Sequence, residues 1–397
     1  MSKRAGFYSL MALIFISLVL RPPLAAIGPL LQEISESLKL DASQQSLLTS
    51  IPVFCFGIGA FLSPWLMRRF GLNASMLMVL TLVLVALLAR ALFGFELLLL
   101  GTVFVGLAIA IANVLLPTLV RVDFADRASL MTSVYTTILA ISASGMAATA
   151  VLFSHSLGGW RLVLLLTAIP AAFAILFWLP RFKQAHVPIA ASVGRIQSRA
   201  VYRSALAWAI LGFFGIQSLG FYVLLGWLPT ILIDSGVSPA SAGGFLGLAT
   251  AIGIPSGFAL APLISRLKSL SVLIAISSSL TTLGFLMLGI LLVTETAGKS
   301  AWMFAVCVLI SVGQTATFPM SLSLIATRAN SQEQTTALSA FSQGWGYLIS
   351  GLGTFAFGAI GSLMHSWSVV VFAVVALCVL QIALGIYAGR DEKIAKQ

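Results

Sequence analysis

The stretch FYSLMALIFISLVLRPPLAAIGPLL, residues 7–31, is apolar and long enough to cross a membrane, and it holds a single charge, Arg21. A helix needs about 20 apolar residues to span the hydrocarbon core of a bilayer. Placing an arginine near the bilayer centre costs about 3 kcal/mol or more, so such a residue usually faces a water-filled cavity and marks a functional site. We therefore expect this chain to build a cavity in which Arg21 has a role.

The composition of the whole chain excludes a soluble protein. Hydrophobic residues make up 59% of the 397 residues and charged residues only 8%, whereas a soluble domain carries about 25% charged residues. The apolar runs are continuous rather than alternating, which indicates an α-helical protein embedded in the lipid bilayer and not a barrel. We predict twelve spans, at 7–32, 43–67, 74–93, 97–120, 130–153, 161–179, 204–227, 240–264, 271–293, 301–326, 335–360 and 367–388.

The net charge of +11 follows from membrane topology and does not require a nucleic-acid partner. If the N-terminus is cytoplasmic, most basic residues fall in the inner segments, and only Lys39, Arg161 and Lys299 fall outside. Short cytoplasmic loops of membrane proteins carry such an excess of lysine and arginine. We therefore predict that both termini are cytoplasmic.

A basic polar stretch, residues 181–203, divides the chain into residues 1–180 and 204–397. The segment GAFLSPWLMRRFGLN (59–73) is repeated as GFALAPLISRLKSLS (257–271), with a glycine, a proline and an arginine at a constant offset of 198 residues. This pattern predicts two six-helix bundles joined by a cytoplasmic linker. Parallel six-helix repeats resemble the arrangement of major facilitator transporters.

That resemblance implies a substrate site near the membrane midplane, lined by the first helix of each three-helix unit. The mid-span polar residues of those helices are Arg21, Asn113, Gln217 and Gln314. We expect these four side chains to face one cavity and to bind substrate. Tyr135 on the fifth span and Gln343 on the eleventh are second-rank candidates for which interhelical hydrogen bonding is the favoured alternative.

Arg21 offers five donors in a planar fork that suits carboxylates and other small oxyanions. The alternative is a structural role, in which Arg21 bonds carbonyls that Pro22 and Pro23 leave without a donor. For Asn113, Gln217 and Gln314 the alternative is hydrogen bonding between helices.

No aspartate or glutamate lies in the middle of any predicted span. A buried carboxylate is a common proton carrier in membrane pumps, so its absence leaves Arg21 to be paired by a substrate anion. Arg90 lies about one turn from the outer end of the third span. We expect it either to extend to the membrane interface or to attract anions at the outer mouth.

The residue inventory argues against an enzyme. His155, His186 and His365 are all predicted in loops, and no metal-binding or phosphate-binding motif is present. Because the three cysteines fall inside apolar spans, neither a disulfide framework nor a metal site is expected. We predict no cofactor.

Three segments resemble the cyanate/2-nitroimidazole transporter family, a branch of the major facilitator superfamily. They are LRPPLAAIGPLLQEI (20–34), GLAIAIANVLLPTLVRVDFADR (106–127) and GWLP (226–229). The resemblance implies a bacterial inner-membrane permease with alternating access, in which Arg21, Asn113 and Pro117 match motif positions. It does not imply that the substrate is cyanate.

The loop between the second and third spans departs from the wider superfamily, because its motif is reduced to RRFG (68–71) without an acid. We expect Arg68, Arg69 and Gly71 in this loop, and Arg121 at the end of the fourth span, to serve conformational change rather than binding.

Together these features predict a monomeric secondary transporter that imports a small anionic or weakly acidic solute with proton coupling. An efflux transporter for small drugs or toxic metabolites is the main alternative. A membrane sensor without transport activity is a third, although no stretch longer than the central loop is available to relay a signal.

Overall fold

A computed structural model describes residues 3–92, 94–182, 199–238, 241–242, 244–249, 251–253, 267, 269–294, 299–364 and 366–395. The ordered elements in these ranges are helical. They are α1 (Lys3–Val19), α2 (Pro22–Ala25), α3 (Ile27–Leu38), α4 (Ala42–Leu92), α5 (Phe95–Asp123), α6 (Ala128–Leu157), α7 (Trp160–Leu166), α8 (Ala168–Phe182), α10 (Ala205–Asp234), α12 (Ser271–Val293), α13 (Lys299–Arg328), α14 (Gln332–Met364) and α15 (Trp367–Ala388).

Eleven of the twelve predicted spans coincide with these helices. Most of the remaining span, 240–264, and with it the second copy of the sequence repeat, lies outside the described residues. Nine helical segments of the described part are both long and apolar enough to cross a membrane. The number is lower than twelve partly because two predicted spans, 43–67 and 74–93, are continuous in α4.

The two spans within α4 meet at Gly71, whose backbone leaves the helical region with φ 74° and ψ 175°. This conformation is essentially restricted to glycine, because a Cβ would clash with the neighbouring backbone. Gly71 therefore provides the turn that sends the chain back across the membrane, and the RRFG segment is the end of one helix rather than an extended loop.

The first predicted span is broken in its middle. Proline lacks the N–H that a helix interior requires, and Pro22 and Pro23 occupy the first turn of the short helix α2. Arg21 precedes them as the residue that caps α2, and its carbonyl accepts hydrogen bonds from Leu24 and Ala25 at 3.1 and 3.0 Å. The break thus places Arg21 between two helical segments, away from a regular helix face.

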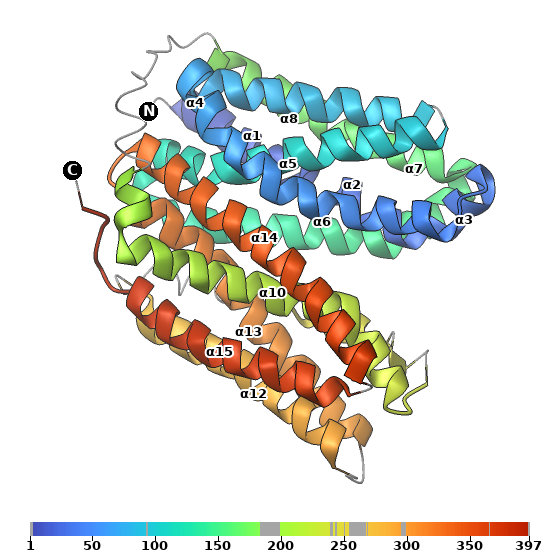
Figure 1. The fold of residues 1–397 in the computed structure, drawn as a ribbon. Helices are drawn as coiled ribbons and strands as arrows, with labels where there is room; N and C mark the ends of the chain where they lie inside the picture. Colours follow the sequence, from blue (N-terminus) through green and yellow to red (C-terminus); the bar gives the residue numbers. More distant parts are fainter. Residues whose placement is uncertain are drawn as a thin grey trace.

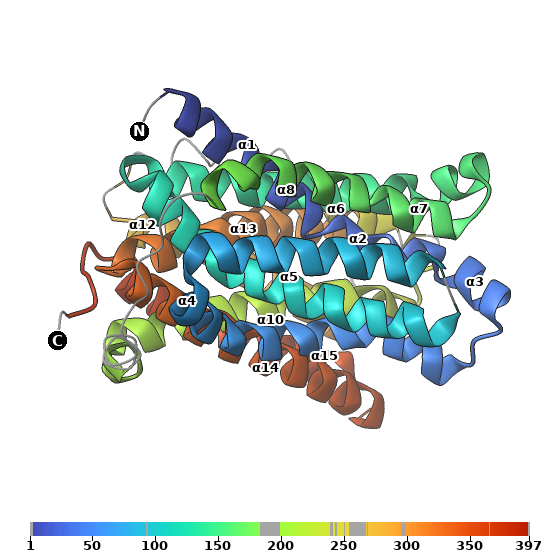
Figure 2. The same cartoon turned by 90° about the horizontal axis from the view of Figure 1, so that it is seen from above.

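The helices form two groups, one from α1 to α8 and one from α10 to α15 (Figure 1). The groups lie close together at the end of the molecule that holds both termini, and they diverge toward the opposite end. Seen from above, α3 and α7 mark that opposite end, far from the termini (Figure 2). The packing of α14 against α4 and α5, and of α13 against α6, joins the two groups.

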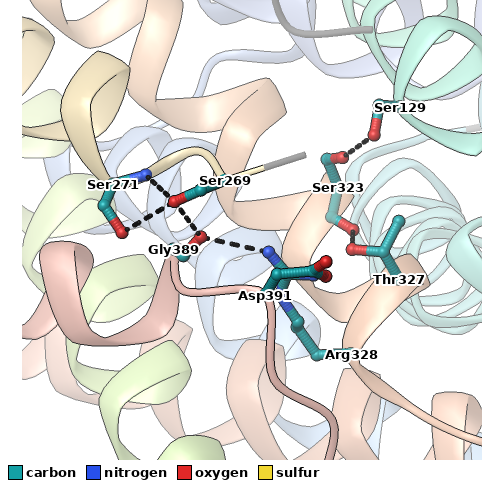
Figure 3. Close-up of polar contacts among 8 residues, drawn as sticks. All are labelled: Ser129, Ser269, Ser271, Ser323, Thr327, Arg328, Gly389 and Asp391. Atoms are coloured by element: carbon teal, nitrogen blue, oxygen red, sulfur yellow. Dashed lines mark hydrogen bonds and ion pairs between the residues drawn. The ribbon is translucent and has the colours of Figure 1, made fainter. Parts of the chain in front are cut away.

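Three polar contacts between the groups lie toward the end with the termini. The hydroxyls of Thr118 on α5 and Thr336 on α14 are 2.8 Å apart. Arg121 donates to the carbonyl of Ala326 over 3.1 Å. Ser323 on α13 donates to Ser129 on α6 over 2.8 Å (Figure 3). These bonds hold this end of the two groups together.

The same end contains a buried ion pair within the first group. Arg181 on α8 donates to both carboxylate oxygens of Asp123 at the end of α5. Arg181 also donates to the Ser9 hydroxyl over 3.0 Å and lies over the Trp178 ring. The pair therefore ties α1, α5 and α8 together where the predicted spans end.

The C-terminal tail packs onto the end of α13. Arg328 donates to the carboxylate of Asp391 at 3.2 Å and to the carbonyl of Gly389 at 3.1 Å. Figure 3 shows that Ser269, next to α12, also donates to the Gly389 carbonyl. Ile394 is buried, and its N–H donates to the Arg328 carbonyl over 2.9 Å. The C-terminal tail, residues 389–394, thus joins α12 to α13.

Candidate functional site

The half-buried guanidinium of Arg21 lies among aromatic side chains from the second group of helices. Its central carbon is 5.9 Å from the centre of the Phe318 ring on α13. The guanidinium also lies close enough to Tyr222 on α10 and Tyr347 on α14 to interact electrostatically with their phenol groups. The cation of one group therefore lies beside three aromatic residues of the other.

Further rings pack around these residues. Phe214 on α10 makes an edge contact with the Tyr347 ring at 5.1 Å and lies 6.4 Å from the Phe318 ring. Phe56 on α4 lies 5.4 Å from Tyr347. This apolar packing fixes the positions of the rings beside Arg21 and lowers the local dielectric, which strengthens the field of the guanidinium.

Asn113 and Gln343 are brought together across the two groups. The Nε2 of Gln343 donates to the backbone carbonyl of Asn113 over 3.1 Å and to the Ser339 hydroxyl over 2.7 Å. The Asn113 side chain is buried, and its Nδ2 has no hydrogen-bond partner among the described residues. Buried polar groups in native proteins are nearly always satisfied, so this amide is free to bind a ligand or water.

Gln217 and Gln314 form a direct pair within the second group. The Nε2 of Gln217 donates to the Oε1 of Gln314 over 3.0 Å. The pair leaves the Nε2 of Gln314 without an acceptor in the described part of the chain. Because Gln314 precedes Phe318 by four residues on α13, the two side chains lie on the same helix face. The free amide therefore faces the same side of α13 as the ring that covers Arg21.

Tyr135 on α6 is buried, and its hydroxyl has no described hydrogen-bond partner. It lies close enough to Tyr347 for the two phenols to interact electrostatically. Since Tyr347 interacts with Arg21 in turn, Tyr135 is connected to the site through Tyr347.

The described part of the chain contains two ion pairs, Arg181 with Asp123 and Arg328 with Asp391, and neither involves Arg21. The positive charge of Arg21 is thus not neutralised by any carboxylate in that part of the chain. Its described side-chain contacts are with aromatic groups and not with the carbonyls near Pro22 and Pro23.

The six sequence candidates therefore lie in three connected sets: Arg21 with Tyr135 through the tyrosines, Asn113 with Gln343, and Gln217 with Gln314. Tyr222, Phe318 and Tyr347 are not among the residues predicted from the sequence, because those were mid-span residues chosen for their polarity. A signal was present. Phe318 and Tyr347 each follow a candidate glutamine by four residues, a spacing that places them on the same helix face.

The motif residues lie outside this set. Pro117 is buried inside α5, one turn beyond Asn113. Arg69 is exposed and lies over the rings of Trp65 and Phe70 at 5.8 and 5.7 Å, and Arg68 is half-buried beside it. His155, which was expected in a loop, lies in the last turn of α6; His186 and His365 are outside the described residues.

Comparisons with known proteins agree with this architecture. The family model of the Major Facilitator Superfamily matches residues 10–354. The 2-nitroimidazole transporter of Escherichia coli (strain K12) is 31% identical over 96% of this chain and 95% of its own length. The cyanate transport protein CynX of the same strain is 28% identical over 94% and 95%. The crystal structure of the transporter FucP in its outward conformation superposes with a TM-score of 0.74, covering 96% of this chain and 98% of that chain at 16% identity.

Proposed function

The chain belongs to the major facilitator superfamily and is a multi-pass membrane transporter rather than an enzyme, and on this premise we propose that it carries a small anionic or weakly acidic solute bound at Arg21. The observation that supports the proposal is the half-buried guanidinium of Arg21, which lies beside Phe318, Tyr222 and Tyr347. A cation without a described carboxylate partner attracts an anion, and a guanidinium can bind one oxyanion through two parallel hydrogen bonds.

Two free amide donors would add direction to the binding. The Nδ2 of Asn113 and the Nε2 of Gln314 are buried and have no described acceptor. A substrate that accepts hydrogen bonds would satisfy both. We assign supporting roles to Gln343 and Gln217, whose own hydrogen bonds hold Asn113 and Gln314 in place, and to the hydroxyl of Tyr135.

The aromatic rings beside Arg21 favour a flat or rod-shaped solute. A flat solute can lie against the faces of Phe318 and Tyr347 while its negative end meets the guanidinium. The two relatives are named for 2-nitroimidazole and for cyanate. Both are small and flat or linear, so they fit the same description.

We propose import coupled to protons, with the proton carried by the substrate. An anion that enters against an inside-negative potential must overcome about 2.3 kcal/mol per charge per 100 mV. None of the acidic residues lies in the middle of a predicted span, and no described carboxylate pairs with Arg21, so we assign the proton to the substrate. If uptake depends neither on pH nor on a counter-anion, this form of coupling is wrong.

We also propose that residues 1–180 and 204–397 are two six-helix halves joined by the linker 181–203. We propose that the protein acts as a monomer in a bacterial inner membrane, with both termini cytoplasmic. The basic residues near both termini support this orientation. In that orientation the bonds from Thr118 and Arg121 to the second group close the cytoplasmic side. The structure then corresponds to a state in which the halves diverge outward (Figure 1).

The test is a thermal-stability screen of the purified protein against cyanate, nitrite, nitrate, short carboxylates, aromatic acids and neutral nitroimidazoles. A ligand that binds only the folded state adds about 2.7 kcal/mol of apparent stability when its concentration is 100 times its dissociation constant. We expect one class of anion to raise the melting temperature of the wild type and to have no effect on Arg21→Gln. Stabilisation by neutral compounds alone that survives in Arg21→Gln would contradict the proposal and favour the efflux alternative.

A further inference from the structure

Arg90 is a second arginine of the first group that the proposed transport does not use. It lies in α4, two residues before the helix ends at Leu92, and its side chain is 0% exposed. It therefore does not extend to the membrane interface. Its Nε and both terminal nitrogens lack hydrogen-bond partners among the described residues. A guanidinium thus stands in the protein interior with all of its donors unpaired.

The position of Arg90 is defined by α5. A Cβ built on Gly101 would lie 2.6 Å from the Cβ of Arg90 and 3.0 Å from the carbonyl of Ala86. Glycine at position 101 therefore provides the space that the stem of Arg90 occupies. The neighbouring Ala91 and Leu98 belong to an apolar cluster that includes residues of α3 and α7, so few acceptors are available nearby.

Two other buried arginines show how this chain satisfies a guanidinium from within. Arg181 binds Asp123, and Arg328 binds Asp391 and a backbone carbonyl. Glu33 on α3 is engaged elsewhere: it accepts from the Ser154 hydroxyl at 2.5 Å and from the Trp160 backbone N–H at 3.0 Å. A buried cation without a partner is strongly unfavourable. Since no acceptor in the described part of the chain meets Arg90, an anion supplied from outside the chain would stabilise it.

We propose that Arg90, whose stem packs against Gly101 of α5, binds a small monovalent inorganic anion at a site separate from Arg21. The site carries one positive charge and its surroundings are apolar, which suits a single monovalent and weakly hydrated anion. Chloride from the medium and a transported anion share this chemistry. The guanidinium is the only anchor that the proposal requires.

The experiment measures chloride binding to the full-length protein in sodium gluconate at constant ionic strength. Thermal melting and the line width of chloride-35 NMR are followed as chloride replaces gluconate, for the wild type, Arg21→Gln, Arg90→Gln and the double variant. We expect saturable stabilisation and line broadening in the wild type and in Arg21→Gln, and at least a tenfold loss of affinity in Arg90→Gln. A saturable effect that persists unchanged in Arg90→Gln would overturn the proposal.

Two further variants keep the test decisive if Arg90→Gln does not fold. Arg90→Lys retains the charge and should bind chloride more weakly, and Gly101→Ala displaces the arginine stem and should do the same. No saturable chloride effect in Arg21→Gln would reject the site, whatever the state of the central site. Competition by cyanate or nitrate in Arg21→Gln would show that the site also accepts oxyanions and pseudohalides. Binding of chloride alone would identify a structural anion. Both results support the site.

Discussion

The Nε2 of Gln217 donates a hydrogen bond to the Oε1 of Gln314 over 3.0 Å, and this bond turns the Nε2 of Gln314 away as an unpaired donor. One glutamine thus orients the other. The pair joins α10 to α13 one helical turn from Phe318, the residue over which Arg21 lies. Its two members are therefore expected to contribute differently to binding.

The first prediction separates these contributions. Gln314→Leu removes the free donor and should weaken substrate binding by about 1 kcal/mol, roughly fivefold in the dissociation constant, as for a hydrogen bond inside a membrane protein. Gln217→Leu leaves the donor in place but releases its orientation, so the loss should be smaller. Titration of the ligand found in the thermal screen measures both. Equal losses would mean that Gln314 acts only as a structural partner.

The second prediction concerns the ring over Arg21. Phe318→Leu keeps an apolar side chain but removes the cation–π contact at 5.9 Å, which is worth about 0.5–2 kcal/mol. We expect the anion to bind several-fold more weakly while the protein remains folded. Phe304→Leu, on the exposed part of the same helix α13, is the matched control and should leave binding unchanged. A loss of similar size in the control would indicate a general effect on α13.

The third prediction tests the ion pair at the end with the termini. The side chains of Arg181 and Asp123 are 9% and 5% exposed, and removing one partner of a buried pair costs about 3–5 kcal/mol. Asp123→Asn should therefore lower the melting temperature markedly. Asp126→Asn, three residues away on an exposed side chain, should have little effect. Similar small shifts in both variants would show that the pair does not support the fold.

Much of the fold follows from the sequence because hydrophobic length determines membrane spans. The structure also has a turn at Gly71, within the predicted loop RRFG. It breaks the first span at Arg21, whereas the sequence analysis predicted one continuous segment, 7–32. The division of the chain into two halves at residues 181–203 remains a prediction, because most of that segment lies outside the described residues.

The candidate site is harder to predict because it depends on contacts between helices. Polarity alone selected Asn113, Gln314 and Gln343, and their amides do meet other polar groups or remain unpaired. It could not select Phe318 or Tyr347, since aromatic residues in apolar spans usually pack in the core. Only the arrangement of α10, α13 and α14 around the break at Arg21 shows that these rings face a cation.

The fourth prediction concerns the turn inside α4. Gly71 has φ 74° and ψ 175°, a region that costs other residues about 1–3 kcal/mol. Gly71→Ala should therefore lower the melting temperature and slow transport, because the turn joins two membrane-spanning segments. Gly145→Ala is the matched control: a Cβ there meets nothing within 4 Å, and the helix α6 tolerates alanine. If Gly71→Ala were as stable as this control, the turn would not require glycine.

The fifth prediction concerns the tail that fastens α12 to α13. Arg328 is buried and donates to both Gly389 and Asp391, whereas the Asp391 side chain is 65% exposed. Arg328→Gln should destabilise the protein clearly, because it removes both the hydrogen bond to the Gly389 carbonyl and the ion pair with Asp391. Asp391→Asn should have a small effect, since exposed ion pairs contribute little. Thermal melting compares the two variants, and a larger effect of Asp391→Asn would mean that charge, not the backbone contact, holds the tail.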